Sequence, residues 1–492
     1  MQDDYVKFIR FAQWKIDTAG EGIIGFITNH NYLDNPTFRG MRRSLLNSFN
    51  KIYILNLHGS SLKKEKSPDG SKDENVFDIK PGVAIALFIK NRNIKEKEVF
   101  YADLFGKRET KYHWLDRHNI LNVEWKRLKP ESPDYLFIPE DSSLKSEYET
   151  YWKITEIFPL NNIGIVTARD ELTIKYSPEE LWQTVSRFVN LSPESARHAF
   201  NLGQDSIDWK VEWAQRDLKE SGPSKNRITP ILYRPFDIRY TYYTGNSSGF
   251  HCRPRPETMN NMLQENLGLI FHRREELAVS YSHFLVTDKI VEHGALSSKT
   301  TCYLAPLYVY KDNIKMPNIN PTLISELTSK YGKTPSELEI FSYIYAVVHS
   351  NKYRTKYANF LKKDFPRIPF AAHYETFKQL VEIGEELINL HLTKIKLKSS
   401  IKFDVRGSNI VDFVEYRNGR VYINKEQFFD GVTEKAWNFY IGGYQVLAKW
   451  LKSRKNRELS SNEIEQFIQI TETINRTLDL MNKIDEIEFL QC

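Results

Sequence analysis

The feature that most constrains the fold is the segment GEGIIGFITNHNYLDNPTFRGMRRSLLNSFNKIYILNLHG, residues 20–59. Its apolar run IIGFIT predicts a strand that is buried on both faces, and KIYILNL predicts a second buried strand. Between them, Asn35 and Pro36 offer a cap and a first-turn proline for a helix that reaches about Phe49. A strand, a helix and a strand in this order predict two parallel strands joined by a right-handed crossover.

The residues on either side extend this α/β pattern. Apolar residues recur at helical spacing from Tyr5 to Ile16, and Gly20 predicts the end of that helix. After the second strand, residues 58–82 form a polar segment, HGSSLKKEKSPDGSKDENVFDIKPG, which precedes a third apolar strand, VAIALFIK. A connection of this length is usually either a functional loop or a mobile one.

Length and composition limit the class of protein. A chain of 492 residues, of which 41% are hydrophobic, is long enough for two to four folded domains. The longest apolar run, residues 83–89, is too short to cross a bilayer, and the N-terminus has the pattern of an amphipathic helix rather than a secretory signal. Cys252, Cys302 and Cys492 lack the spacing of a disulfide framework or a thiolate zinc site. We therefore expect a cytoplasmic protein with no membrane segment.

The charge of the chain permits a nucleic-acid partner without requiring one. The formal net charge is +6, and the basic residues gather in several runs. In two of these, residues 351–370 and 449–460, aromatic residues are interleaved with the bases. Because a solvated helix face is the usual explanation of a basic run, the runs alone do not identify a binding surface.

The rest of the chain predicts a different architecture. Residues 107–370 are irregular, with short strand-like runs and many turns, which is typical of a mixed α+β domain that presents loops. Asn418-Gly419 between alternating apolar residues predicts a type I′ hairpin, and Gly442-Gly443 is interpreted as a close helix contact. Helices are predicted over residues 178–190, 193–201, 374–396, 434–454 and 461–487.

Two loops are candidates for an active-site rim, because open α/β sheets bind ligands beyond the carboxyl ends of their strands. In the first, TNHNYLDN, the side chains of Asn29, Asn31 and Asp34 either hydrogen-bond a substrate or form the turn. The second is the loop after His58. Its Phe77 either stacks on a flat ligand such as a nucleobase or anchors the loop on the sheet.

Several kinds of site are missing from the sequence. No strand is followed by the glycine-rich turn of a nucleotide site, no Walker phosphate loop occurs, and no His, Cys and Glu cluster has the spacing of metal ligands. Asp78 and Lys80, after Pro68-Asp69, only loosely resemble the carboxylates and lysine of a metal-dependent nuclease, and they lie in a turn-rich loop. The sequence therefore predicts no metal site.

The order of the motifs resembles that of a known family. The strings GIIGFITNHNYLDNPTFRGMRRSLL, IYILNLHG, ENVFDIKPGVAIALFIK, LYRPFDIRYTYYTGNSSGF, FSYIYAVVHSNKYRTKYANFLKKDFPRIPF and FYIGGYQVLAKWLKSRKNREL occur in this order. They resemble the C-terminal part of large single-chain bacterial restriction-modification enzymes, the type ISP and related type IIG proteins. The resemblance covers nearly the whole chain.

This resemblance implies a fold class and three domains. Residues 1–106 are expected to be the end of an adenine-specific methyltransferase domain, a partial Rossmann-like α/β sheet in which VAIALFIK is the antiparallel seventh strand. Residues 107–372 are expected to form a mixed α+β target-recognition domain. Residues 373–492 are expected to form a C-terminal specificity subdomain with a long helix, a hairpin and further helices.

The resemblance also implies an activity. Family members transfer a methyl group from S-adenosylmethionine to an adenine that is flipped out of double-stranded DNA. Phe77 resembles the aromatic residue that stacks on this adenine. The residues that resemble the active-site rim are Asn29, His30, Asn31 and Tyr32.

Target reading is expected downstream, through basic side chains that contact bases or phosphates. In YRPFDIR there is an alternative, a buried ion-pair framework of Arg234, Asp237 and Arg239. The candidate DNA contacts are Arg253, Arg255, Arg273, Arg274 and Arg239.

One departure from the family changes the expected function. The cofactor-binding glycine turn and the catalytic Asn-Pro-Pro-Tyr motif do not occur, since Asn35-Pro36 and Asn320-Pro321 are each followed by Thr. No S-adenosylmethionine-binding residue is therefore assigned, and we expect catalysis to need a partner, encoded upstream, that carries the missing half. Two alternatives stay open: a DNA-binding specificity protein without chemistry, and a truncated product that an exposed sheet edge keeps from folding stably.

Overall fold

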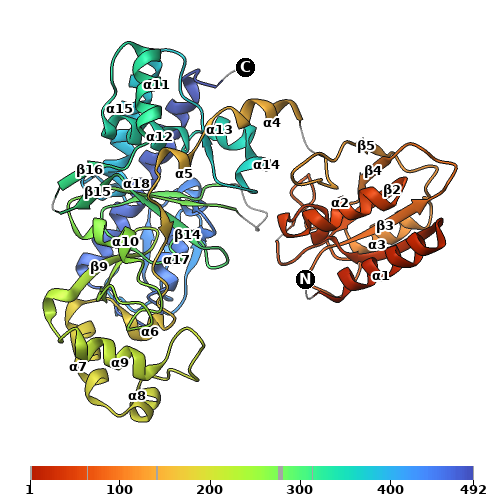
Figure 1. Cartoon of the computed structure of the whole chain (residues 1–492). Coiled ribbons are helices and arrows are strands. Elements are labelled where there is room, and N and C mark those ends of the chain that lie inside the picture. Colours follow the sequence, from red (N-terminus) through yellow and green to blue (C-terminus); the bar gives the residue numbers. More distant parts are fainter. Residues whose placement is uncertain (1–2, 64, 140–141, 275–280, 313, 491–492) are drawn as a thin grey trace. The chain divides into compact units, whose positions relative to one another are not determined.

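A computed structural model of the chain describes residues 3–63, 65–139, 142–274, 281–312 and 314–490 (Figure 1). The chain divides into two compact units, one within Met1–Ser146 and the other within Glu147–Glu275 and Ser280–Cys492. Each unit has its own sheets and its own core, so we describe them separately.

The first unit is a five-stranded sheet with helices on both faces. The strands are paired in the order β1-β3-β2-β4-β5. The elements are α1 (Asp4–Ala19), β1 (Gly22–Asn29), the 3-10 turns η1 (His30–Leu33) and η2 (Pro36–Phe38), α2 (Arg39–Ser48), β2 (Lys51–His58), β3 (Val83–Lys90), β4 (Glu98–Asp103), α3 (Arg108–Leu115) and β5 (Lys126–Leu128). The unit boundary at Ser146 falls within helix α4 (Ser142–Glu149).

The directions of these strands agree with the predictions, and their order adds a detail that the predictions lacked. Strand β3 pairs antiparallel with both β1 and β2, as expected for VAIALFIK. Strands β1 and β2 therefore run in the same direction, as predicted, but they are not neighbours, because β3 lies between them. Strand β4 extends the sheet parallel to β2, and β5 pairs antiparallel with β4.

Strand β1 is buried on one face only, which differs from the prediction of a strand buried on both. Helix α1 covers its inner face, where Ile24 packs with Val6 and Ile9 in the core. On the other face the side chains of Ile23 and Ile27 are 66% and 43% exposed. Strand β1 is also the last strand in the described sheet, so its outer edge has no strand partner in this part of the chain.

The first unit extends beyond residue 106, because the chain after α3 returns to the same core. Leu128 of β5 and Phe137 are buried in the cluster that also holds Phe88 of β3. The unit boundary at Ser146 therefore differs from the predicted domain end at residue 106. No local sequence signal marks this return, since it depends on a contact between distant segments.

A buried arginine ties three segments of the first unit together. The side chain of Arg42 on α2 has no exposed surface. Its guanidinium donates to the carbonyl oxygens of Tyr32 and Asn35 at 2.8 Å each, and to that of Asp134 at 2.7 and 2.9 Å. Burial lowers the pKa of Arg42 to about 10, so the side chain stays protonated at neutral pH. It thus satisfies backbone carbonyls that lie outside regular structure.

The second unit contains two four-stranded sheets and most of the helices (Figure 1). Its helices are α5 (Ile154–Ile157), α6 (Asp170–Thr173), α7 (Pro178–Asn190), α8 (Pro193–Ala199), α9 (Val211–Glu220), η3 (Lys225–Arg227), α10 (Pro256–Met259), η4 (Asn260–Leu263), α11 (Pro321–Tyr331), α12 (Glu337–Val347), α13 (Asn351–Lys356), α14 (Ala358–Leu361), α15 (Tyr374–His391), α16 (Glu434–Trp437), α17 (Val446–Lys452) and α18 (Ser461–Glu486).

The strands of the second unit are short. They are β6 (Trp152–Lys153), β7 (Asn162–Ile163), β8 (Ile174–Lys175), β9 (Ile228–Arg234), β10 (Asp237–Tyr242), β11 (Gly268–His272), β12 (Phe284–Thr287), β13 (Ile290–Val291), β14 (Cys302–Pro306), β15 (Tyr308–Lys311), β16 (Ile314–Pro317), β17 (Arg367–Ile368), β18 (Glu415–Arg417), β19 (Arg420–Tyr422), β20 (Phe428–Asp430), β21 (Tyr440–Ile441) and β22 (Tyr444–Gln445). The larger sheets have the orders β13-β9-β10-β8 and β12-β11-β14-β7.

Residues after 372 share their core with the residues before them. Helix α15 packs on α12 so closely that a Cβ on Gly384 would lie 1.9 Å from the carbonyl oxygen of Ser342. Helix α18 contributes to both large clusters of this unit, with Phe467 in one and Ile484 in the other. The residues of the predicted C-terminal subdomain thus belong to the same compact unit as those of the predicted target-recognition domain.

Local predictions in this unit have mixed outcomes. Helix α7 has the predicted bounds, and Asn418 and Gly419 have φ of 48° and 83°, as a type I′ turn between β18 and β19 requires. The predicted helix over residues 434–454 is instead broken into α16, the β21-β22 hairpin and α17. Gly442 forms the hairpin turn rather than a helix contact, because its φ is 59° and a Cβ there would meet the carbonyl of Leu296.

Two expectations from composition concern cysteines and membranes. Cys252 and Cys302 are buried thiols, and burial raises the pKa of both. Cys492 lies outside the described residues. Among the helices that the structure describes, none combines the length and the apolar character needed to cross a bilayer.

We expect Arg42→Met to destabilise the first unit. Three carbonyl oxygens lose their donor, and at about 1 kcal/mol for each lost hydrogen bond the free energy of unfolding should fall by about 3 kcal/mol. Urea denaturation, with amide hydrogen exchange of residues 32–45 as a local probe, measures the change. Arg43→Met is the matched control, because Arg43 is exposed on the same helix. An equal effect of the two substitutions would contradict this role of Arg42.

Candidate functional site

The C-terminal ends of β1, β2 and β4 lie at one edge of the first unit's sheet. Asn29 and His58 are both opposite Val83 of β3 in the strand register. Asp103, at the end of β4, pairs in register with Asn56 of β2. Because these strands run in the same direction, the loops that follow β1 and β2 meet at this edge, as the sequence predicted for an active-site rim.

The predicted rim residues after β1 differ in their exposure. Asn29 and Asn31 are partly exposed, and the side-chain oxygen of Asn29 accepts a hydrogen bond of 2.9 Å from the backbone amide of Asn31, which is the turn-forming role. His30 is 3% exposed, and its backbone amide donates to the carbonyl of Gly82. Tyr32 has no exposed surface, so its side chain belongs to the core rather than to the rim, a correction that follows from its packing with Tyr5.

The long polar loop between β2 and β3 is fastened to the sheet by a buried ion pair. The carboxylate of Asp73 lies 2.9 Å from the ammonium of Lys111 on α3, and neither side chain is exposed. The same carboxylate accepts the backbone amides of Gly59 and Gly106 at 2.6 and 2.7 Å. Lys111 also donates to the carbonyls of Leu57 and Glu74. Every charge in this pair is therefore compensated by hydrogen bonds as well as by its partner.

A second group of hydrogen bonds closes the loop on itself. The side-chain amide of Asn75 donates to the carbonyls of Pro81 at 2.7 Å and of Gly59 and Ile79 at 3.2 Å. Gly59 has a φ of 80°, and a Cβ on it would lie 2.4 Å from Cα of Asn75. Only glycine fits this crossing, because any side chain would collide with the backbone.

The anchoring of the loop leaves Phe77 at the surface. The neighbouring Val76 is 3% exposed and packs with Leu57 and Leu104, so it fills the anchoring position. Phe77 itself is 44% exposed. Its backbone is held at both ends, since its amide donates to the side chain of Asn75 and its carbonyl accepts from Arg108 at 3.1 Å. The ring is thus exposed on a fixed backbone.

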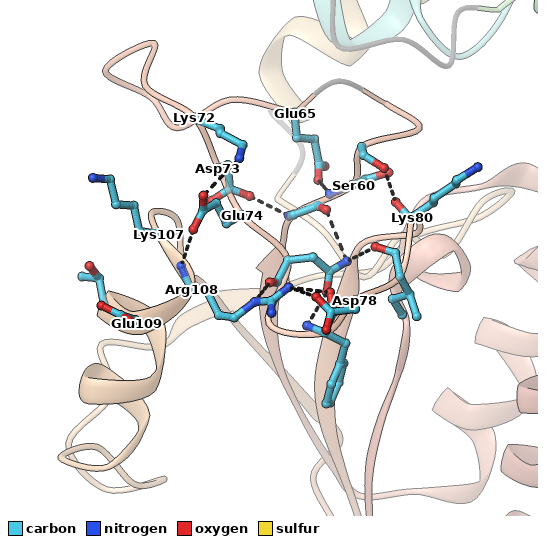
Figure 2. Close-up of a pocket in the computed structure, with 16 residues that line it drawn as sticks. Ser60, Glu65, Lys72, Asp73, Glu74, Asp78, Lys80, Lys107, Arg108 and Glu109 are labelled. Atoms are coloured by element: carbon cyan, nitrogen blue, oxygen red, sulfur yellow. Dashed lines mark hydrogen bonds and ion pairs between the residues drawn. The ribbon is translucent and has the colours of Figure 1, made fainter.

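Phe77 borders a hollow of about 890 Å³ between this loop and α3 (Figure 2). The walls are strongly charged, with acidic and basic side chains interleaved. Arg108 and Asp78, which both line the hollow, form an ion pair of 2.7 Å. The cationic side chains that line it are Lys72, Lys80, Lys107 and Arg108. The acidic side chains that line it are Glu65, Asp73, Glu74, Asp78 and Glu109. The charges therefore favour neither an anionic nor a cationic ligand, whereas the exposed ring suits a flat one.

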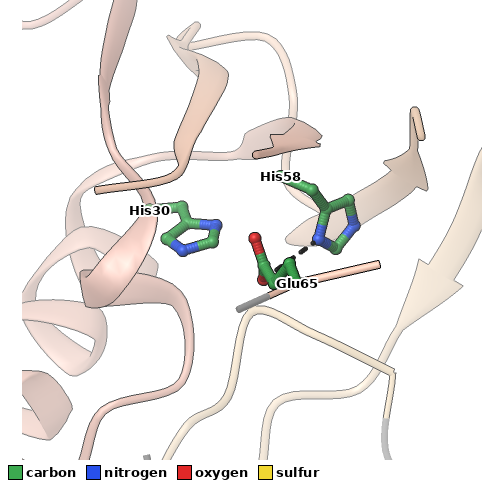
Figure 3. A group of neighbouring side chains, drawn as sticks. All are labelled: His30, His58 and Glu65. Atoms are coloured by element: carbon green, nitrogen blue, oxygen red, sulfur yellow. Dashed lines mark hydrogen bonds and ion pairs between the residues drawn. The ribbon is translucent and has the colours of Figure 1, made fainter. Parts of the chain in front are cut away.

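A cluster of His30, His58 and Glu65 lies at the same edge (Figure 3), and the sequence did not predict it. Burial lowers the pKa of His30, and the charge of Lys63 lowers it further. Burial alone would lower the pKa of His58, but hydrogen bonds to Asp103 and Glu65 raise it. Burial alone would raise the pKa of Glu65, but hydrogen bonds from His58 and from the Ser60 amide leave it at about 2.

The candidate arginines of YRPFDIR are part of a buried framework. The guanidinium of Arg239 lies 2.7 Å from the carboxylate of Asp237 and stacks between Tyr176 and Tyr233 at 4.2 Å from each ring centroid. The other carboxylate oxygen of Asp237 pairs with Arg454. Arg239 is only 8% exposed, so it is not available as a DNA contact, and its pairing with Asp237 favours the ion-pair alternative for this residue. Arg234 pairs with Glu292 instead of Asp237, so the framework differs from the predicted set.

The other candidate arginines lie at the surface of the second unit. Arg253 and Arg255 line one hollow of about 470 Å³ together with Trp213, and Arg253 pairs with Asp208 at 2.6 Å. Arg273 is exposed and pairs with Asp364 at 3.2 Å. Arg274 is also exposed. Arg253 and Arg255 therefore share a hollow with the ring of Trp213, whereas the guanidinium of Arg273 lies 5.7 Å from the ring centroid of Phe365.

Comparison with known proteins identifies what the chain is similar to. A family model described as the type ISP C-terminal specificity domain matches residues 156–483. No curated protein matches the chain. Three solved structures share its fold: the DrdV–DNA complex, a nuclease-deletion mutant of the type ISP restriction-modification enzyme LlaGI with a DNA substrate mimic, and the ATP-dependent type ISP enzyme LlaBIII bound to DNA.

The likeness to these structures extends along the whole chain at low identity. For DrdV the identity is 22%, with 98% of this chain and 52% of that chain covered and a TM-score of 0.76. For LlaGI the identity is 23%, with 100% of this chain and 49% of that chain covered and a TM-score of 0.74. For LlaBIII the identity is 22%, with 99% of this chain and 34% of that chain covered and a TM-score of 0.76. The chain thus spans about half of DrdV and LlaGI and a third of LlaBIII.

We expect Lys111→Met to loosen the loop that carries Phe77. The substitution leaves the Asp73 carboxylate buried without its cation, which should cost about 3 kcal/mol. Hydrogen exchange of residues 59–82 should accelerate. Lys107→Met is the matched control, because Lys107 is exposed beside the same helix. Unchanged exchange in the Lys111 variant would show that the ion pair does not hold the loop.

Proposed function

The chain belongs to the family of the type ISP C-terminal specificity domain, and from this membership we propose that it recognises a DNA sequence for a restriction-modification enzyme. The membership confirms the resemblance found in the sequence. DNA is the proposed partner because three solved structures of the same fold, those of DrdV, LlaGI and LlaBIII, are complexes with DNA or with a DNA substrate mimic. The match to the specificity family over residues 156–483 is the observation that carries this proposal.

The first unit is proposed to be the end of an adenine-specific methyltransferase domain. Three observations support this: the order β1-β3-β2 with an antiparallel central strand, the two loops that meet at one sheet edge, and the exposed ring of Phe77 in the second loop. An adenine amine is inaccessible inside the duplex, so the base must be extruded before it is methylated. Phe77 is proposed to stack on the extruded adenine and hold it at the rim.

The methyl donor is proposed to be S-adenosylmethionine, bound by groups outside these 492 residues. The glycine turn and the Asn-Pro-Pro-Tyr motif that would bind the cofactor and the target amine do not occur in the sequence. A methyltransferase N-terminal half, encoded upstream, is proposed to supply them. The open outer face of β1, with Ile23 and Ile27 exposed, supports a further contact, because exposed apolar surface of this kind usually marks an interface.

Arg253 and Arg255 are the preferred DNA contacts, and Arg273 and Arg274 are further candidates. Arg253, Arg255 and Trp213 line one hollow, which thus combines guanidinium groups that attract phosphates with a ring that offers a stacking platform. Asp208 pairs with Arg253 at 2.6 Å and would exchange this partner for a phosphate. Sequence-independent phosphate contacts are the expected role of these side chains.

The second candidate function is specificity without chemistry, which the missing cofactor motifs favour. The two candidates differ in one measurement. Mixing the chain with an N-terminal methyltransferase half, labelled S-adenosylmethionine and DNA should produce methylated adenine under the first candidate and none under the second. Binding of S-adenosylmethionine to this chain alone would contradict both candidates, because each assumes that the chain has no binding site for this cofactor.

Selection from a pool of random duplexes tests the recognition proposal directly. The chain should enrich one sequence, and its affinity for that sequence should exceed its affinity for unrelated DNA at every salt concentration tested. Affinity for all duplexes should fall as salt rises, because phosphate contacts release counterions. Salt-dependent binding with no enriched sequence would contradict the proposal.

We expect Phe77→Ala to impair extrusion of the target adenine while leaving DNA affinity nearly unchanged. Loss of a base-stacking contact of about 1–3 kcal/mol corresponds to a 5- to 150-fold decrease in the flipped population. With 2-aminopurine at the target position, fluorescence in the complex with both halves reports that population. Phe77→Trp should restore the signal. Leu62→Ala is the matched control, because Leu62 is exposed in the same loop but does not line the hollow, and it should have no effect.

We expect Arg253→Ala to weaken DNA binding to all sequences by a similar factor. Removal of one phosphate contact should reduce the slope of log affinity against log salt by about 1. Arg476→Ala provides the matched control, because Arg476 is also a partly exposed arginine in an ion pair, with Glu386 at 2.6 Å. A change in sequence preference without a change in salt slope would instead identify Arg253 as a base reader.

A further inference from the structure

Three side chains from separate segments converge at the sheet edge (Figure 3). His30 follows β1, His58 ends β2, and Glu65 lies in the loop between β2 and β3. One nitrogen of each histidine and one carboxylate oxygen lie within 4.8 Å of one another. We propose that these three side chains bind a divalent transition-metal ion, for which zinc is the best match.

The hydrogen bonds around His30 point a nitrogen lone pair into the cluster. The backbone amide of His58 donates to the side-chain oxygen of Asn56 at 3.2 Å, which identifies that atom as the acceptor. His30 Nδ1 lies 3.0 Å from the same oxygen and must therefore carry its proton. Its Nε2 is then the unprotonated nitrogen, the form that binds metal ions.

This nitrogen has no other partner among the described residues. His30 is 3% exposed, and its Nε2 is buried without a hydrogen bond. A buried ring nitrogen without a partner is unusual and costs the loss of its hydration. Space beside it is kept open by Gly82, since a Cβ there would lie 2.7 Å from Nε2.

His58 is oriented in the way that histidine ligands of metal ions usually are. Its Nε2 lies 2.7 Å from a carboxylate oxygen of Asp103, which also accepts the hydroxyl of Tyr101. A carboxylate can only accept, so it holds the proton on Nε2 and leaves Nδ1 for a metal ion. Carboxylate–histidine pairs of this kind fix the ring and increase its basicity as a ligand.

The position of Glu65 completes the set. One carboxylate oxygen accepts the backbone amide of Ser60 at 2.7 Å, which directs the other toward His58. That oxygen lies 3.5 Å from His58 Nδ1, a long distance for a hydrogen bond between charged groups. Two ligands of a tetrahedral zinc ion are about 3.3 Å apart, so the observed spacing fits an ion that both atoms bind.

The ligand types narrow the choice of metal. Two imidazoles and one carboxylate suit zinc and similar transition metals, whereas calcium and magnesium prefer oxygen ligands. Three protein ligands leave a fourth position for solvent. A bound ion would join the ends of β1 and β2 to the loop that carries Phe77, and so stabilise the rim of the candidate site.

The alternative is a metal-free ion pair, in which protonated His58 lies between Glu65 and Asp103. It explains the contacts of His58, but it leaves the buried Nε2 of His30 unexplained. The two accounts differ in whether the chain binds zinc and whether that binding needs His30.

Metal analysis of the purified full chain tests the proposal. The chain is treated with a chelator, dialysed against zinc chloride and then against buffer, and its zinc content is measured by mass spectrometry. We expect one tightly bound zinc per chain. His30→Ala and Glu65→Gln should each weaken binding at least about 100-fold, and Asp103→Asn about 10- to 100-fold, because Asp103 only orients His58.

His113→Ala is the matched control, because His113 is an exposed histidine of the same unit and should leave zinc binding unchanged. Circular dichroism shows whether each variant is folded. For the unchanged chain, cobalt substitution gives a second readout that needs no variant: visible absorption typical of a four-coordinate nitrogen and oxygen site supports the proposal. Absence of stoichiometric zinc, or zinc binding that is the same in folded His30→Ala and Glu65→Gln chains, would overturn it.

Discussion

Strand β3 runs antiparallel between β1 and β2, and the candidate site depends on this arrangement. Because both outer strands pair with the same central strand in the same sense, their C-terminal ends reach one edge of the sheet. Asn29 and His58 then both lie opposite Val83, and the loops that follow them are brought together.

The loop between β2 and β3 shows how buried charge can fix a polar segment. A loop of this length and polarity has too few apolar side chains to be held by hydrophobic packing alone. Here the Asp73–Lys111 pair and the amide of Asn75 bind its backbone at several points. The apolar contribution of Val76 is small by comparison, yet it decides that Phe77 faces solvent. A ring held on a fixed backbone loses little freedom when it binds a flat ligand, which favours binding.

Elements with a strong local pattern could be predicted, and long-range packing could not. Strands β1, β2 and β3 and helix α7 follow from apolar periodicity and from Pro or Asn signals at their ends. The extension of the first unit to Ser146 could not be predicted, because it depends on Phe137 returning to a core formed by residues far earlier in the chain. Likewise, composition makes Arg239 a plausible DNA contact, and only the positions of Asp237 and the two tyrosines remove it.

The sequence by itself determined strands β1 to β3, the longer helices α1, α7, α15 and α18, the family and the two loops that form the rim, because each depends on residues that are close together or on long strings in a fixed order. Tertiary structure decided which side chains of those loops are exposed, which arginines are buried, and that His30, His58 and Glu65 meet. The physical reason is that these contacts join segments whose separation along the chain carries no periodic signal. They exist only once pairing with β3 has brought the ends of β1 and β2 to the same edge of the sheet.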